Sequence, residues 1–229
     1  MLYYMYFGYG LVIIAFIITL LADIYLRIRY SKYKKVKVKS GMTGAEVARE
    51  ILKSNGLDNV YVVETKGYLT DHYDPKAKVV RLSTDIYNGD SIASVSVAAH
   101  ECGHAVQDKD GYFFLRFRSF LVPIVNFSSK FGYLAILIGL IFGALDLAWV
   151  GIFLLVAIVL FQLITLPVEL NASKRGKMFL TKLNVVEAGE RSMASSMLMA
   201  AAMTYVASLI STLLELLRLI LIVMGNDRD

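Results

Sequence analysis

His100-Glu101-Cys102-Gly103-His104 is the stretch that most narrows the possible structures of this chain. The two histidines are four positions apart, so on an α-helix their side chains lie on one face and both imidazoles can bind the same metal ion. Glu101 is rotated by about 100° from His100 around the helix. From there its carboxylate can reach a water molecule on the metal without binding the metal itself. The spacing therefore predicts a zinc site of the hydrolytic type.

The residues around this motif favour a helix that is packed on most sides. Residues 91–99 are small or apolar, as expected for a helix that is open only at its metal-binding end, and this context argues against two merely solvated histidines. Cys102 is turned about 200° from the first histidine, so we expect it in the core. Gly103 has no side chain, so we expect either a close backbone segment or tight helix packing there.

The composition is that of a membrane protein. Hydrophobic residues make up 57% of the 229 residues and charged residues 19%, whereas soluble domains contain about 25% charged residues. Four regions contain the roughly 20 apolar residues that a membrane-spanning helix needs. They are Tyr3 to Ala22, a stretch that starts before Lys130 and ends near Leu145, Leu147 to Val168, and Ser195 to Met224. The last is the least certain, because Glu215 and Arg218 can pair inside a bundle or mark a helix at the membrane interface.

Basic residues predict how the chain crosses the membrane. A cluster of them follows the first apolar region: Arg27, Arg29, Lys32, Lys34, Lys35, Lys37 and Lys39. Because lysine and arginine favour the cytoplasmic side, we expect an outside N-terminus, residues 25–118 inside, a hairpin turn near Asp146 outside, and residues 169–193 inside. The first region has no basic stretch before it, so we expect an anchor that is retained.

This topology accounts for the net charge of +5. Nucleic-acid binding has no further support, because no aromatic-interleaved platform accompanies the basic residues. Attraction to anionic lipid is the better interpretation of the basic cluster. The lone cysteine excludes a disulfide within the chain, in agreement with a reducing compartment.

The sequence thus predicts a mainly α membrane protein with about four transmembrane or interfacial helices and a small α+β zincin-like cytoplasmic lobe. Five segments are expected. They are an N-terminal membrane anchor (1–24), the cytoplasmic lobe with the motif helix (25–118), a transmembrane hairpin (119–168), a cytoplasmic segment with the third metal ligand (169–193), and a C-terminal membrane helix (194–229).

Within the lobe, the residues before the motif predict a helix and two strands. Thr43 and Glu46 form a capping-box pattern, and the amphipathic helix that they begin should end at Gly56. Residues 59–64 and 78–82 are expected to be strands. An exposed strand edge beside the metal could pair with an extended peptide substrate. The alternative is a hairpin that only covers the motif helix.

The remaining histidine lies between these strands, in Asp71-His72-Tyr73-Asp74. His72 could stabilise an oxyanion or position a substrate. The favoured interpretation is a hydrogen-bonded turn, in which aspartate side chains accept hydrogen bonds from nearby backbone amides.

A catalytic zinc normally has three protein ligands and one open position, so the two histidines need a partner. Glu169 is the main candidate, because it follows the third apolar region and two membrane crossings return it to the side that holds His100 and His104. Glu187 and Glu190 share that side but lie in a polar segment, where we expect solvated carboxylates. An interfacial carboxylate without a metal is the alternative for Glu169.

Over nearly its full length the chain resembles the YugP-like family of neutral zinc metallopeptidases of prokaryotic membranes. The motifs that carry the resemblance are Leu69-Thr70-Asp71-His72-Tyr73-Asp74-Pro75, Arg81-Leu82-Ser83, Ala98-Ala99-His100-Glu101-Cys102-Gly103-His104-Ala105-Val106-Gln107 and Val168-Glu169-Leu170-Asn171-Ala172-Ser173. The chain is more distantly similar to membrane gluzincins of the HtpX and CAAX-processing type, whose third ligand is the glutamate of a Glu-x-x-Ala-Asp run. The resemblance implies Glu169 as the third ligand. Ser173 stands where those enzymes have aspartate, so Asn171 or Ser173 is implied as the partner of a ligand histidine.

The expected activity is that of a membrane-embedded zinc endopeptidase with one zinc ion per chain. It would cleave membrane or membrane-proximal proteins at the cytoplasmic face of the prokaryotic inner membrane. His100, His104 and Glu169 would hold the zinc, while Glu101 would take a proton from the zinc-bound water and pass it to the leaving amine.

Two other kinds of function remain as alternatives. One is a zinc-stabilised membrane scaffold without proteolytic activity, in which a fourth protein ligand would close the site. The other, a small transporter, is disfavoured because the sequence has no evident internal repeat or paired broken helices. The sequence leaves open whether the chain forms an oligomer or binds a partner protein.

Overall fold

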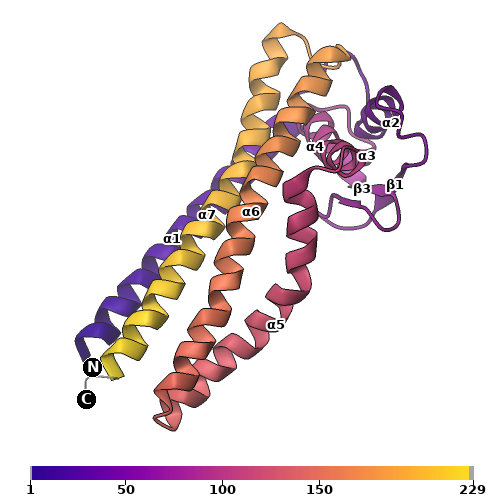
Figure 1. The fold of residues 1–229 in the computed structure, drawn as a ribbon. Coiled ribbons are helices and arrows are strands. Elements are labelled where there is room, and N and C mark those ends of the chain that lie inside the picture. The colour runs from indigo at the N-terminus through magenta and orange to yellow at the C-terminus, as the bar shows by residue number, and fades with distance from the viewer. Residues whose placement is uncertain (1, 227–229) are drawn as a thin grey trace. The chain divides into compact units, whose positions relative to one another are not determined.

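The computed structural model describes residues 2–226. Met1 and residues 227–229, at the outer ends of the first and last predicted segments, lie outside the described residues. The helices are α1 (Leu2–Lys34), α2 (Gly44–Ser54), α3 (Thr84–Tyr87), α4 (Ile92–Lys109), α5 (Phe113–Ile141), α6 (Leu145–Lys182) and α7 (Ala188–Asn226), and the strands are β1 (Tyr61–Thr65), β2 (His72–Asp74) and β3 (Val79–Ser83) (Figure 1). The predicted fold class, a mainly helical membrane protein with a small sheet, is confirmed.

Within residues 2–226, four helices, α1, α5, α6 and α7, are long and apolar enough to cross a membrane. Helices α1, α6 and α7 contain their predicted apolar regions and continue beyond them, whereas α5 ends at Ile141, a few residues before the predicted end near Leu145. Large hydrophobic side chains are exposed along them, such as Phe16 at 66% and Phe153 at 78%, which suits helices surrounded by lipid. The turn predicted near Asp146 lies just before that residue, between α5 and α6, where Gly143 has a positive φ of 66° that a residue with a side chain rarely adopts.

The described chain forms two compact units. The apolar unit comprises Met1–Asp23, Phe117–Leu166 and Thr204–Asp229, and the sheet unit comprises Ile24–Arg116 and Pro167–Met203. In the apolar unit, α5, α6 and α7 contribute Ile136, Ile152 and Leu219 to a shared core. Glu215 and Arg218 form a bidentate ion pair on α7, with N···O distances of 2.6 and 2.8 Å, so their charges neutralise each other.

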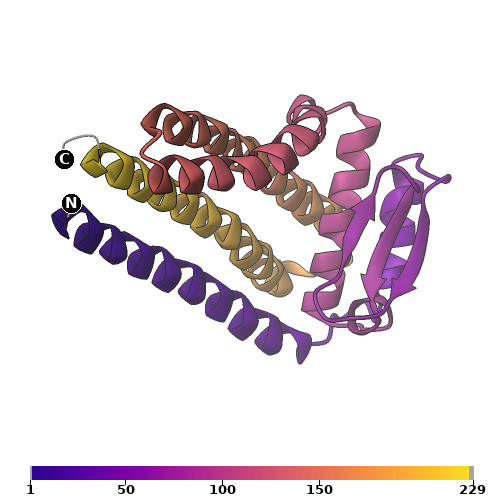
Figure 2. The ribbon, with the colours of Figure 1, turned by 90° about the horizontal axis from the view of Figure 1, so that it is seen from below.

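The sheet unit contains a three-stranded mixed sheet in the order β1-β3-β2. Figure 2 shows these strands beside α4. The strands expected at 59–64 and 78–82 are present as β1 and β3, but they pair in parallel rather than as a hairpin.

The turn expected over residues 71–74 is wrong in part, because residues 72–74 form β2, antiparallel to β3. Tyr73 draws this segment inward, since its hydroxyl donates to Asp108 at 2.9 Å. Asp74 does accept turn bonds from Lys76 N and Ala77 N.

Side-chain caps fix where α2 and α4 begin. Thr43 and Glu46 form both hydrogen bonds of the predicted capping box. At the start of α4, Ser91 Oγ accepts a hydrogen bond from the backbone amide of Ser94 at 3.1 Å. The two helices pack in one hydrophobic core that includes the fully buried Ile51. This core holds the motif helix in place, because the β-branched residues of α4 lower its intrinsic helicity.

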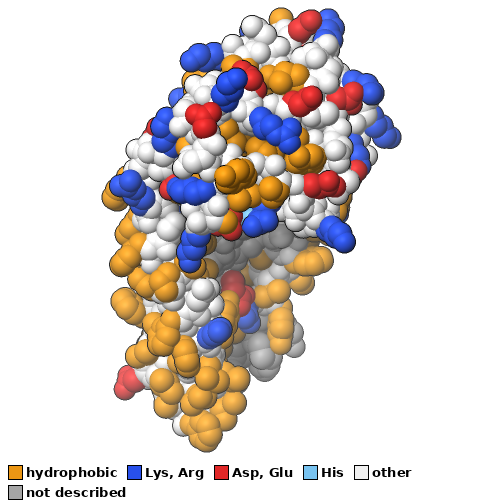
Figure 3. All heavy atoms as spheres, turned by 90° about the vertical axis from the view of Figure 1, so that its right-hand side faces the viewer, with side chains coloured by type: hydrophobic (Ala, Val, Ile, Leu, Met, Phe, Trp, Pro, Cys, Tyr) orange, Lys and Arg blue, Asp and Glu red, His pale blue; other side chains and the backbone are white. Residues whose placement is uncertain are grey.

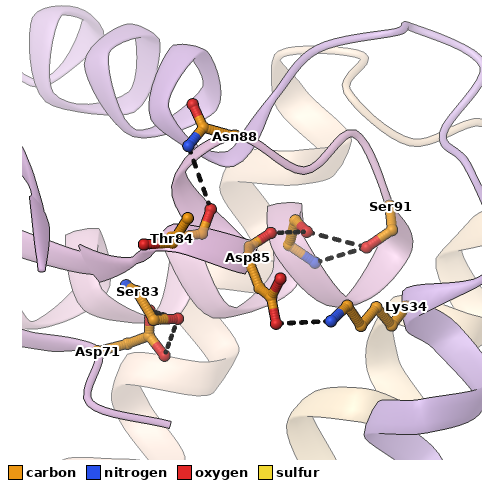
Figure 4. Close-up of polar contacts among 8 residues, drawn as sticks. Lys34, Asp71, Ser83, Thr84, Asp85, Asn88 and Ser91 are labelled. Atoms are coloured by element: carbon orange, nitrogen blue, oxygen red, sulfur yellow. Dashed lines mark hydrogen bonds and ion pairs between the residues drawn. The ribbon is translucent and has the colours of Figure 1, made fainter. Parts of the chain in front are cut away.

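Polar contacts hold the end of β3 to the segment before β2, and the end of α1 to α3 (Figure 4). The Asp71 carboxylate accepts hydrogen bonds from Ser83 N at 2.7 Å and Ser83 Oγ at 3.0 Å. Burial raises the pKa of Asp71, although the bonds from Ser83 act in the opposite direction. Lys34 Nζ lies 2.6 Å from Asp85 Oδ2, so the last turn of α1 is anchored to the segment that leads into α4.

Acidic and basic side chains are interspersed over the sheet unit on the face drawn in Figure 3. Glu187 is exposed as predicted, and its carboxylate lies 2.6 Å from Lys39 Nζ. The expectation of a solvated Glu190 is wrong, because this residue is only 6% exposed. Its carboxylate accepts hydrogen bonds from the backbone amides of Lys39 at 2.9 Å and Glu187 at 2.8 Å. These two backbone amides would otherwise have no acceptor near the start of α7, and their hydrogen bonds explain why the carboxylate can be buried.

Candidate metal centre

Two glycines bring α4 and α6 into backbone contact (Figure 1). A Cβ atom on Gly103 would lie 2.6 Å from the carbonyl oxygen of Ala172, and one on Gly176 would lie 3.1 Å from the carbonyl oxygen of Ala99. The close backbone approach predicted at Gly103 is therefore confirmed, and the approaching segment is α6. This contact places Glu169 of α6 beside the histidine face of α4.

His100, His104 and Glu169 form the candidate metal site. Each offers one ligand atom, and these atoms all lie within 4.8 Å of one another. Glu169 Oε2 is 3.2 Å from His100 Nε2 and 3.4 Å from His104 Nε2. Ligands placed tetrahedrally at about 2.1 Å from a zinc ion are about 3.4 Å apart. The residues therefore fit a zinc ion in the number, type and spacing of their ligand atoms.

The site is electronegative and mostly shielded from water. The Glu169 side chain is only 2% exposed, and a carboxylate so deeply buried requires compensating partners. Burial lowers the pKa of His104, but its hydrogen bond to Glu169 and the charge of that carboxylate outweigh this effect, so the pKa is raised. Such a carboxylate between two imidazoles favours a cation.

One side of the site remains accessible. The side chains of His100 and His104 are 13% and 12% exposed. Glu101 is 8% exposed, and no hydrogen bond to its carboxylate occurs within residues 2–226. The group of metal-ligand side chains has three members among these residues. Three protein ligands with an open side are typical of a catalytic zinc site.

Cys102 does not take part in the site. Its thiol is buried and donates to the carbonyl oxygen of Ala48 at 3.6 Å, so the prediction of a core residue is confirmed. His72, the third histidine, is also outside the group. It lies exposed in β2, where its Nδ1 is 2.8 Å from the carbonyl oxygen of Thr70. His72 therefore lies in a strand rather than in the turn that we favoured, and its role in substrate binding stays a prediction.

Each histidine of the site has a neutral partner on its other ring nitrogen. Ser173 Oγ lies 3.1 Å from His100 Nδ1, so the structure brings this predicted partner to a histidine. Asn171 touches neither ring, but its Oδ1 accepts a hydrogen bond from Gln107 Nε2 at 2.9 Å. Gln107 Oε1 in turn lies 3.0 Å from His104 Nδ1. Sequence reasoning assigned no role to Gln107, although it follows His104 by three positions and so lies on the same helix face.

Comparisons with known proteins agree with this geometry. Residues 8–224 match the family described as "Putative neutral zinc metallopeptidase". The chain is 47% identical over 208 residues to "Putative membrane protease YugP" of Bacillus subtilis (strain 168), and this match covers 91% of the chain and 92% of the relative. No solved structure matches the chain.

Proposed function

Because the chain belongs to the family of neutral zinc metallopeptidases, we propose that it is a membrane-embedded, zinc-dependent endopeptidase. The observation that carries this proposal is the convergence of three ligand atoms from α4 and α6 within 4.8 Å. His100, His104 and Glu169 hold one zinc ion, and Glu101 is the general base. The family membership supports the type of reaction, and the grouping of these residues supports their roles.

The chemistry of the proposed reaction is divided between the metal and the chain. Bound zinc supplies a Lewis acid and lowers the pKa of water towards neutrality. Glu101 takes a proton from the attacking water and later passes it to the leaving amine. Its carboxylate is available for this transfer because no described residue hydrogen-bonds to it. The buried carboxylate of Glu169 and the two imidazoles would hold the metal.

The sheet supplies a surface on which a peptide can bind. β2 pairs with β3 on one side only, and it contacts α4, which carries the histidines. An extended peptide can pair with the open edge of β2 through main-chain hydrogen bonds, which require little side-chain selectivity. We therefore propose as substrates those membrane or membrane-proximal proteins that present an extended segment.

The location of the site is also part of the proposal. The basic cluster that begins at Arg27 follows the first apolar region of α1, and such clusters favour the cytoplasmic side and anionic lipid. We infer that the reaction takes place at the cytoplasmic face of the prokaryotic inner membrane. Labelling of cysteines placed in residues 25–118 with a membrane-impermeant reagent tests this orientation. If the reagent labelled these cysteines in intact cells, residues 25–118 would lie outside and the proposed orientation would be wrong.

Metal analysis combined with a proteolysis assay tests the proposed function. Glu169→Ala should lose zinc, because it removes one of three ligands. Glu101→Gln should retain zinc and lose about 10²- to 10⁴-fold in turnover. Glu50→Gln is the matched control, because Glu50 is exposed on α2, and we expect it to retain zinc and activity.

Three results would contradict the proposal. Undiminished turnover by Glu101→Gln would refute the assigned base, and full zinc content in Glu169→Ala would refute the third ligand. Zinc binding by the wild type without cleavage of unfolded or membrane-embedded substrates would instead favour the zinc-stabilised scaffold. That alternative calls for a fourth protein ligand, whereas the described group has three.

A further inference from the structure

We propose that Gln107 and Arg175 are positioning residues that fix the tautomer of His104, so that its Nε2 presents a lone pair to the metal. The inference rests on the proposed function, because it takes His104 as a metal ligand. It concerns a line of hydrogen bonds that runs from the ring, through two amide side chains, to an ion pair. We call these residues the His104 relay: His104, Gln107, Asn171, Arg175 and Asp110.

The His104 relay connects α4 and α6. Gln107 Oε1 lies 3.0 Å from His104 Nδ1, and Gln107 Nε2 donates to Asn171 Oδ1 at 2.9 Å. Asn171 Oδ1 also accepts from Arg175 Nε at 2.8 Å. Arg175 Nη1 lies 2.6 Å from Asp110 Oδ2, just beyond the end of α4. One end of the relay is therefore His104 of α4, and the other is Asp110, the residue that caps this helix.

The chemistry of arginine sets the direction of every bond in the relay. A guanidinium group only donates hydrogen bonds, so the atom of Asn171 that faces Arg175 must be the carbonyl oxygen. The atom of Gln107 that faces this oxygen must then be the amide nitrogen. Because a glutamine amide has one nitrogen and one oxygen, its oxygen is left to face His104.

A second contact sets the same orientation independently. Gln107 Nε2 also donates to the backbone carbonyl oxygen of Val168 at 2.8 Å. If the amide were reversed, its oxygen would face two acceptors, Val168 O and Asn171 Oδ1. Gln107 is 0% exposed, so water could not compensate for such a mismatch. The orientation of this side chain is thus determined by the surrounding groups.

The orientation of Gln107 determines which nitrogen of His104 carries hydrogen. An oxygen beside Nδ1 requires Nδ1 to be the donor, which leaves the lone pair of the neutral ring on Nε2. That lone pair faces Glu169 Oε2 at 3.4 Å. Two acceptor atoms so placed repel each other unless a cation lies between them. A proton shared in the hydrogen bond to Glu169 or a metal ion can fill this place, so the relay makes Nε2 the nitrogen at which a metal ion would bind.

His100 differs from His104 in this respect. Its Nδ1 lies beside Ser173 Oγ at 3.1 Å, and a hydroxyl can either donate or accept. The contact with Ser173 is therefore compatible with both tautomers of His100. The asymmetry makes Gln107 the more specific of the two partners, and we expect its loss to weaken zinc binding more than the loss of Ser173.

The test is a double-mutant cycle on zinc affinity, measured on the full chain in detergent by competition with a chelator. Gln107→Leu should weaken zinc binding by about 10- to 100-fold, as is common for groups that orient a metal-binding histidine. Arg175→Met should weaken it by a smaller factor. In the Gln107→Leu background, Arg175→Met should have no further effect, because it acts through the missing amide.

Lys174→Met is the matched control for charge. Lys174 is exposed on α6 next to Arg175, so this substitution removes the same charge without breaking the relay. A cation near a zinc ion repels it, so loss of charge alone should tighten zinc binding or leave it unchanged. If Arg175→Met weakens zinc binding and Lys174→Met does not, the loss in Arg175→Met is therefore due to the hydrogen bonds and not to the charge.

Nitrogen-15 spectra of the zinc-loaded wild type give a readout that requires no variant. The chain has three histidines, so their ring signals are few. We expect His104 to show a protonated Nδ1 that exchanges slowly with water and a metal-bound Nε2. In Gln107→Leu the Nδ1 proton should exchange rapidly.

Each of the following results would overturn the relay: metal bound at Nδ1 of His104, unchanged zinc affinity in Gln107→Leu, or additive effects in the double mutant. Failure of the proposed function has a different signature. A wild type that binds zinc and shows the expected spectra but cleaves no protein would refute the endopeptidase and leave the relay intact. A wild type that binds no zinc would overturn both.

Discussion

A Cβ atom at Gly103 would lie 2.6 Å from the carbonyl oxygen of Ala172. Real Cβ atoms do not approach backbone oxygens this closely, so α4 and α6 touch at this point through their main chains. Glu169 lies one turn before Ala172 on α6, and His104 follows Gly103 directly on α4. The distance between the carboxylate and the imidazole is therefore set by how closely the two backbones approach each other.

Gly103→Ala should separate these helices and weaken the metal site. We expect a loss of about 1–3 kcal/mol in the free energy of unfolding, as for other overpacked positions, together with lower zinc affinity. Gly189→Ala is the matched control, because nothing lies within 4 Å of its Cβ position on α7. We expect the control to be neutral or slightly more stable, since alanine favours helices. Equal stability and zinc content of the two variants would contradict the expected contact.

Glu190→Ala should destabilise the sheet unit more than Glu187→Ala. Removal of the Glu190 carboxylate leaves the amides of Lys39 and Glu187 without an acceptor, which costs about 1–3 kcal/mol when such donors are buried. Glu187→Ala removes only an exposed ion pair with Lys39, for which we expect a smaller loss of stability. Denaturant unfolding of both variants measures the difference. The reverse order would show that the two hydrogen bonds contribute little.

Asp71→Asn should make the metal-free protein more stable near neutral pH. Burial raises the pKa of Asp71 in the folded chain, so the folded state holds this proton more tightly than the unfolded state. Its contribution to stability is then largest in acid and is lost as pH rises through the folded pKa. Asparagine carries no charge to bury, and its oxygen can still accept from Ser83.

Asp74→Asn serves as the control, because the pKa of Asp74 is shifted in the opposite direction from that of Asp71. Hydrogen bonds from Ala77 N and Lys76 N hold the pKa of Asp74 below its usual value. This residue therefore contributes stability above its unfolded pKa of about 3.9, and the contribution is lost as pH falls through the folded pKa. Unfolding curves recorded across the acid range with a chelator present compare the two variants. If the difference in stability from the wild type changed with pH in the same direction for both variants, the environments assigned to Asp71 and Asp74 would be wrong.

Cys102 should resist thiol reagents until the protein unfolds. The side chain is fully buried, and burial, followed by the charge of Glu101, raises the pKa of its thiol. Reaction with iodoacetamide should therefore be slow in the native protein and fast in denaturant. Cys102→Ala with Lys66→Cys provides a positive control, because Lys66 is exposed. Rapid native labelling at Cys102 would show that this face of α4 opens to water.

Features that depend on neighbouring residues could be predicted from the sequence. The two histidines at helical spacing, the capping box of Thr43 and Glu46, and the hairpin turn at Gly143 are local patterns, and the structure contains each of them. β2 was missed because three residues are too few to show a strand pattern, and its pairing with β3 depends on the tertiary structure rather than on the local sequence.

The environment of the candidate site depended on contacts that the sequence does not specify. Membrane topology narrowed the third ligand to a few carboxylates and favoured Glu169, which the structure brings to the histidines. The roles of Gln107 and Arg175 follow from the faces on which α4 and α6 meet. Small residues such as Gly103 and Gly176 permit that contact, but glycine alone does not identify its partner.

The interval between the histidines and Glu169 has a consequence for biosynthesis. His100 and Glu169 are 69 residues apart, and the interval contains all of α5 and more than half of α6. A ribosome-bound chain that has completed only α4 carries two of the three donor atoms. Its third donor emerges after the hairpin, so the nascent protein cannot mature until both arms have been synthesised. A chain truncated before that point would contain the membrane-anchoring α1 and both histidines but not Glu169, so we expect it to bind zinc weakly.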